Sequence, residues 1–290
     1  MKKINTILAM SILGLFSACN FNKSVSTDLM TGLTTKGDGL SADKVYISDG
    51  TNKLNDNTFF YGQIVYTNFK NIGGFVVENG NIYPEMEVAV ISKAGDTVLQ
   101  NKNLLEGKPI KAASADLNGN ITLASPIQSR ETYYVEYKVF DTKGDGVFYS
   151  KLELELEKDP KVKLIENGLS VKEAYIFNQD NRTIITDGKI GFDDNVLLDM
   201  QGLKGYAMRD GKASLGMSVK VTDAKDKVIL DLPDLLKDRD LSEAQIKQGL
   251  GSTVKINKGV LTNPVTWQVE IWDKNGDARL NCSTQLEVQK

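Results

Sequence analysis

Gly39-Leu40-Ser41-Ala42-Asp43-Lys44-Val45-Tyr46-Ile47 has a close counterpart 129 residues further along the chain, Gly168-Leu169-Ser170-Val171-Lys172-Glu173-Ala174-Tyr175-Ile176. Self-similarity at a fixed spacing is the signature of a repeated structural unit. We therefore predict an internal duplication, and this prediction decides how the rest of the chain is interpreted.

The match continues through both copies while the spacing grows only from 129 to 132 residues. The paired segments are Phe75-Val76-Val77-Glu78-Asn79-Gly80 with Tyr206-Ala207-Met208-Arg209-Asp210-Gly211, and Val135-Glu136-Tyr137-Lys138-Val139 with Trp267-Gln268-Val269-Glu270-Ile271. A chain of 290 residues also exceeds what one core normally organises. We predict two tandem homologous domains, residues 39–158 and 164–290, joined by a short linker at 159–163.

Within each copy the hydrophobic pattern has the period of β-strands. Leu152, Leu154 and Leu156 alternate with charged residues, and Met217 and Val219 alternate with polar ones. Alternation of this kind predicts strands with one buried face. The domains are therefore expected to be all-β.

Turn signals separate these strands. Asn79-Gly80 and Asp210-Gly211 occupy matched positions and suit the positive φ angles of a tight hairpin turn. Further turns are predicted at residues 94–96, 117–120 and 143–146. About seven short strands per copy result, which is typical of an immunoglobulin-like or C2-like β-sandwich.

A short surface helix is predicted at residues 241–248. Ser242 and Gln245 have capping-box spacing, Glu243 lies in the first turn, and Gly249 follows as a stop. The equivalent stretch of the first copy lacks the cap. Because loops carry function on sandwiches, this divergent segment is a candidate partner-contact loop; the alternative is a tolerated connection.

The N-terminus has the features of an exported protein. Lys2 and Lys3 precede an apolar run that closes on Ser17-Ala18-Cys19. This arrangement resembles the signal of bacterial lipoproteins, which implies cleavage after Ala18 and a diacylglycerol on Cys19. We expect a signal peptide at residues 1–18 and a lipidated flexible tether at 19–38, rich in Ser, Thr, Gly and Asn. The alternative is an ordinary signal peptide with Cys19 left unmodified.

The residues after Cys19 bear on localisation. The chain resembles lipoproteins of Bacteroidota, and those that are exported to the cell surface usually carry an acidic cluster after the lipidated cysteine. Here no acidic residue follows Cys19 before Asp28, so this cluster is absent from the sequence. The resemblance implies an anchor in the outer membrane, facing the periplasm.

Composition excludes several function classes. The chain has no histidine, so the commonest general base and the commonest transition-metal ligand are both absent from its sequence. Its net charge of −3 becomes −5 when Lys2 and Lys3 are removed with the signal peptide, so no basic face attracts nucleic acid. No cofactor is implied. Cys282 has no second cysteine to pair with once Cys19 is lipidated. It lies in an apolar-alternating stretch, so it is expected to be a buried core residue, and the alternative is a reactive or intermolecular thiol. Its counterpart in the first copy is Ser150, so the position is not tied to sulfur chemistry.

Two patterns suggest ligands. Asp273, Asn275 and Asp277 resemble the start of a calcium loop, but the position of the bidentate Glu falls on Thr284. A polar turn is expected, with a looser oxygen-ligand site as the alternative.

Among the aromatics, the strand pattern places Trp267 inside the sandwich and Trp272 outside, where Trp272 could contact a partner or stack on a glycan.

These observations predict a membrane-anchored, non-catalytic binding or assembly protein of the bacterial envelope. The duplicated sandwiches would contact another envelope protein, and the candidate contact residues are Ser242, Glu243, Gln245 and Trp272. The alternative is a glycan-binding or adhesive surface lipoprotein.

Overall fold

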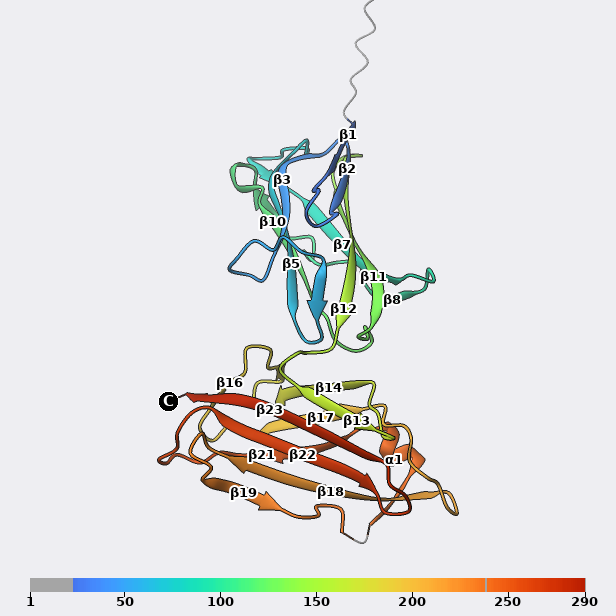
Figure 1. Ribbon diagram of the computed structural model, residues 1–290. Helices are drawn as coiled ribbons and strands as arrows, with labels where there is room; N and C mark the ends of the chain where they lie inside the picture. The colour runs from blue at the N-terminus through green and yellow to red at the C-terminus, as the bar shows by residue number, and fades with distance from the viewer. Residues whose placement is uncertain (1–22, 238, 290) are drawn as a thin grey trace, which may run out of the picture.

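The computed structural model describes residues 23–237 and 239–289. In these residues nearly all regular structure is β-strand, with one short α-helix and one 3-10 turn, so the chain is an all-β sandwich protein. Two hydrophobic cores form, one from Leu33 to Leu156 and one from Val162 to Val288. We call the two parts of the chain around these cores half one (residues 23–157) and half two (residues 162–289). Figure 1 shows half one above half two, with the linker between them. No helix in the described ranges is long and apolar enough to span a bilayer.

Half one packs a large sheet against a smaller one. The large sheet runs in the order β1 (Lys23–Thr27), β2 (Thr34–Asp38), β12 (Val147–Glu157), β11 (Glu131–Asp141), β7 (Pro84–Ser92) and β8 (Thr97–Asn101), with β4 (Thr58–Phe60) parallel to β12. The smaller sheet contains β10 (Leu117–Thr122), β5 (Ile64–Gly73) and β3 (Ser41–Ser48). A separate two-stranded ribbon contains β6 (Asn81–Ile82) and β9 (Ile110–Lys111). The 3-10 turn Ala112–Ser114 follows β9 and precedes β10.

Half two has a related arrangement. Its large sheet runs β13 (Lys163–Asn167), β23 (Arg279–Gln289), β22 (Val265–Asp273), β18 (Lys212–Thr222) and β19 (Val228–Leu232), with β16 (Lys189–Gly191) beside β23 and β20 (Asp240–Ser242) beside β18. The second sheet runs β15 (Thr183–Ile184), β14 (Glu173–Asn178), β17 (Val196–Gln201) and β21 (Leu250–Val254). Helix α1 covers Glu243–Lys247.

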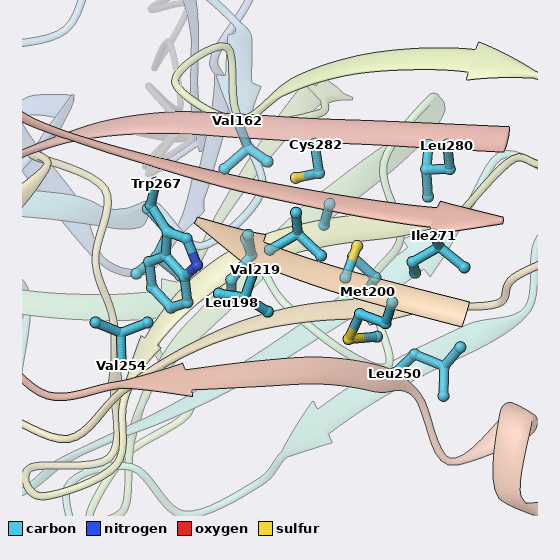
Figure 2. Packing of buried hydrophobic residues seen from close by; sticks show 14 of the residues in the cluster. Val162, Leu198, Met200, Val219, Leu250, Val254, Trp267, Ile271, Leu280 and Cys282 are labelled. Carbon is cyan, nitrogen blue, oxygen red and sulfur yellow. The ribbon is translucent and has the colours of Figure 1, made fainter. Parts of the chain in front are cut away.

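The predicted strand faces are confirmed. Leu152, Leu154 and Leu156 are buried on one face of β12, and Trp267 is 1% exposed in the core of half two. Figure 2 shows Trp267 and Cys282 among the aliphatic side chains of that core. The alternating pattern identified these faces because a strand presents every second residue to the same side.

The two matched hairpin turns are also confirmed. Asn79 and Gly80 have φ angles of 52° and 74°, and Asp210 and Gly211 have 50° and 74°. Both turns are closed by paired backbone hydrogen bonds of the flanking residues. Both halves therefore use the same two-residue turn.

The turn predicted at residues 117–120 is wrong, because these residues form the start of β10. Gly119 is a strand residue here, and a Cβ on it would lie 2.2 Å from the ring of Tyr137. The glycine therefore serves close packing against an aromatic ring rather than a change of chain direction.

The expectation of a flexible tether over residues 19–38 is wrong for residues 23–38. These residues form the β1–β2 hairpin, and β2 pairs with β12 from Thr34↔Lys151 to Asp38↔Val147. Leu33, 2% exposed, joins the core of half one. The hairpin is polar because it lies at the sheet edge, where main-chain pairing matters more than apolar burial. Cys19 and the predicted signal peptide lie outside the described residues.

Candidate binding surfaces

Helix α1 forms where the capping box predicted it. The Ser242 hydroxyl accepts a hydrogen bond from the Gln245 N–H at 3.3 Å, and the Ser242 N–H donates to Gln245 Oε1 at 2.9 Å. Ile246 is buried and holds the helix on the core, whereas Glu243 and Lys247 are exposed and form an ion pair of 2.8 Å. Ser242 and Gln245 therefore stabilise the helix start, and Glu243 is the charged one of the three predicted contact residues in this loop, exposed beside Lys247.

Trp272 is half-buried on the outer face of the large sheet of half two. It pairs with Gly216 of β18, and a Cβ added to Gly216 would lie 2.1 Å from the indole. Since Ser242 pairs with Lys212 on the same strand, both predicted contact sites border one end of β18. They lie on opposite sides of that strand, because Trp272 is on β22 and Ser242 on β20.

The acidic turns are structural in both halves. Asp141 is buried and accepts hydrogen bonds from the N–H groups of Val76 at 2.7 Å and Lys143 at 2.9 Å. Asp273 does the same for Ala207 at 2.6 Å and Asn275 at 2.8 Å. No group of acidic or sulfur ligands arranged for a metal occurs in residues 23–237 and 239–289. Each carboxylate closes a turn and fixes a neighbouring loop.

A buried carboxylate joins the two halves. Glu173 of β14 accepts hydrogen bonds from the Ser129 N–H at 2.7 Å and the Ser129 hydroxyl at 2.8 Å, and both residues are buried. Burial raises the pKa of Glu173, while the hydrogen bonds from Ser129 and the charges of Lys158 and Lys172 act in the opposite direction. Ser129 comes from the loop between β10 and β11, so the contact connects two distant parts of the chain.

Aromatic rings extend this junction. The rings of Tyr61 and Tyr175 lie 5.2 Å apart, and a Cβ on Gly62 would lie 2.4 Å from Ile184. The Tyr175 hydroxyl donates to Asp199 at 2.8 Å, which fixes the ring from the side of half two. Tight packing and buried hydrogen bonds favour one relative orientation of the halves.

The residues of this junction were not predicted as a site. The sequence carried one signal: Lys44 of the first copy stands where the second copy has Glu173, within an otherwise apolar strand. A buried acid requires a partner, but the sequence does not say which residue supplies it.

Cys282 is buried, as predicted. It is 1% exposed in β23, and burial raises the pKa of its thiol to about 12. A thiol in this state is a small apolar core residue with little nucleophilic thiolate.

Strand edges are the other open surfaces. The large sheet of half one ends at β1 and β8, and that of half two ends at β13 and β19. Aliphatic side chains are exposed on three of these edge strands: Val25 at 76%, Ile165 at 67% and Val228 at 50%. Unpaired strand edges can bind further strands.

Comparisons with known proteins add no family. No protein-family model matches the sequence, and no curated protein matches it. Among solved structures, one described as "pT26-6p" aligns with 93% of this chain at 7% identity and a TM-score of 0.22. The chain spans 66% of that structure's length.

Proposed function

We propose that this chain is a non-catalytic binding or assembly lipoprotein of the bacterial envelope, anchored through Cys19, which contacts another envelope protein through its sandwiches. The observation that carries the proposal is the buried Glu173–Ser129 contact, which joins two sandwiches whose sheets have several open strand edges. An arrangement of this kind suits the presentation of edges and loops at a set distance from a membrane. We place the anchor in the outer membrane, facing the periplasm.

The anchor is tested by mass spectrometry of the N-terminal peptide and by membrane fractionation. The expected result is a diacylglycerol on Cys19 and release of a Cys19→Ser variant into the soluble fraction. An unacylated N-terminus in the membrane fraction would contradict the anchor.

Partner contact is tested by photo-cross-linking in intact cells, with the cross-linker placed at exposed positions of both halves. We expect one envelope protein to be captured reproducibly. Protease treatment of whole cells should leave the domains intact if they face the periplasm.

A glycan-binding function is the second candidate. One observation favours it: Tyr149 of β12 is 41% exposed beside a hollow of about 440 Å³ that Glu136, Lys138 and Lys151 also line. Exposed aromatic faces can stack on sugars. Retention on polysaccharide gels that is lost in Tyr149→Ala, together with shaving of the domains from whole cells, would favour this candidate over the first.

A further inference from the structure

The β13 edge of half two is equivalent to a covered edge of half one. β2 pairs with β12 so that Asp38 lies opposite Val147, and β13 pairs with β23 so that Asn167 lies opposite Arg279. These positions match at the spacings of the duplication, 129 and 132 residues. The two strands therefore occupy the same place in the same register.

In half one this edge is covered by β1, which pairs antiparallel with all five residues of β2. In half two, β13 pairs with β23 and with no second strand among the described residues. The reason lies in the connection: β12 ends at Glu157 and β13 begins at Lys163, so no residues are available for a hairpin. The outward N–H and C=O groups of β13 have no covering strand from residues 23–237 and 239–289.

The central residues of β2 and β13 differ in the direction opposite to that expected for a strand edge exposed to water. Lys36 on the covered strand corresponds to Ile165 on the open strand, and Ile165 is 67% exposed. Open edges are normally protected by charged residues, especially lysine. β13 carries the charged residues Lys163 and Glu166, but at its central position the lysine is on the covered strand and the β-branched aliphatic is on the open one. An exposed isoleucine at the centre of a five-residue open strand indicates that this edge is covered in the assembled state.

We propose that β13 accepts an extended, antiparallel segment of the envelope partner, which takes the place that β1 takes in half one. This inference rests on the proposed function and names its contact. The β1–β2 pairing, applied to β13, gives the chemistry of the segment. It has about five mostly polar residues without proline, and a β-branched aliphatic lies opposite Ile165, as Val25 lies opposite Lys36.

The position of half one favours a single segment over a second sandwich. Figure 1 shows half one on the side of half two at which β13 and β14 lie. Lys158, just before β13, forms an ion pair of 3.4 Å with Glu166 of β13, so the linker stays close to this strand. A thin extended segment needs only one strand spacing, about 4.8 Å, beside the edge.

The first test uses a capped peptide with the sequence of residues 23–27 and the mature full chain carrying Cys19→Ser. Hydrogen exchange should slow at the amides of β13 when the peptide is present. Ile165→Lys, which installs the residue of the covered strand, should weaken this effect about fivefold. Val260→Lys is the matched control, because Val260 is 91% exposed and lies beside Lys227, next to β19 at the opposite edge of the sheet. Unchanged exchange at β13, or equal protection in Ile165→Lys, would overturn the proposal.

The second test repeats the envelope cross-linking with both variants. Loss of the captured partner in Ile165→Lys but not in Val260→Lys supports the proposal. A partner retained in both variants overturns the β13 assignment and leaves the proposed function standing. Failure to capture any partner from any position, with β13 still protected by the peptide, contradicts the proposed function instead. Concentration-dependent dimerisation that Ile165→Lys abolishes would assign the edge to a second copy and overturn the proposal.

Discussion

Glu173 and Ser129 form the central contact between the halves, because one carboxylate accepts both the backbone N–H and the hydroxyl of a single serine, at 2.7 and 2.8 Å. Both residues are buried, so the hydrogen bonds are protected from competition with water. The Glu173 side chain thus contributes to the relative orientation of the two sandwiches, together with the packing of Tyr61 on Tyr175.

Removing this carboxylate should destabilise the junction. Glu173→Ala leaves the Ser129 donors buried without a partner, which should cost about 1–3 kcal/mol of unfolding free energy. Chemical denaturation measures this cost, and small-angle scattering measures the spread of orientations. Ser129→Ala is the control, and the double variant should lose less than the sum of the single variants. Additive losses would show that the two residues act independently.

The raised pKa of Glu173 predicts a pH dependence. A carboxyl whose pKa is higher in the folded state binds its proton more tightly there, so its contribution to stability is present below the unfolded pKa and is lost as pH rises through the folded pKa. Relative to Glu173→Gln, the wild type should therefore gain stability as the pH falls from neutrality towards the ordinary value of 4.5. Denaturation midpoints of both proteins over this range give the comparison, and a constant difference would contradict it.

The Gly216–Trp272 pair should show size complementarity. A Cβ at Gly216 would lie 2.1 Å from the indole, so Gly216→Ala should cost about 1–3 kcal/mol. Half one has Glu85 and Phe140 at the matched positions. Trp272→Phe should therefore restore part of the stability lost in Gly216→Ala. Equal stability of the single and double variants would contradict this explanation.

The two buried aspartates should behave alike and independently of calcium. Asp141→Ala and Asp273→Ala each leave two backbone N–H groups without their acceptor, so each should lower the unfolding free energy by about 1–3 kcal/mol. Thermal unfolding with calcium or with chelator should give the same midpoint for the wild type. A calcium-dependent rise in that midpoint would favour the looser metal site.

Cys282 should be unreactive while the protein is folded. With its pKa raised to about 12 and its side chain buried, the thiolate is scarce at neutral pH. In a Cys19→Ser variant, alkylation followed by mass spectrometry should label Cys282 in denaturant and not in buffer. Cys282→Ser copies Ser150 of half one and should keep the fold.

The strand faces and tight turns could be predicted from sequence because they depend on local patterns. Leu152 and Trp267 follow the two-residue period of a strand, and Asn79-Gly80 supplies the φ angles that its turn requires. The capping box at Ser242 is local in the same sense. In each case the residues that decide the structure are within a few positions of one another.

The remaining features depend on contacts between distant residues. The β1–β2 hairpin has the polar composition of a tether because its stability comes from pairing with β12. Gly119 suits a turn by its type, but the ring of Tyr137, brought to it by the fold, makes it a strand residue. The Ser129–Glu173 contact joins residues 44 positions apart, and no local pattern identifies the partner. The duplication itself stays a prediction, supported by the matched turns and aspartates.

The shared register of β2 and β13 also places the start of the predicted duplicated unit earlier in the chain. The sequence match begins at Gly39 and Gly168, yet the first equivalent strands begin at Thr34 and Lys163. A recombinant fragment meant to fold as the second unit alone should therefore begin before Lys163. Starting at Gly168 would delete a strand of the sheet and leave β23, a central strand, as the new boundary of the molecule.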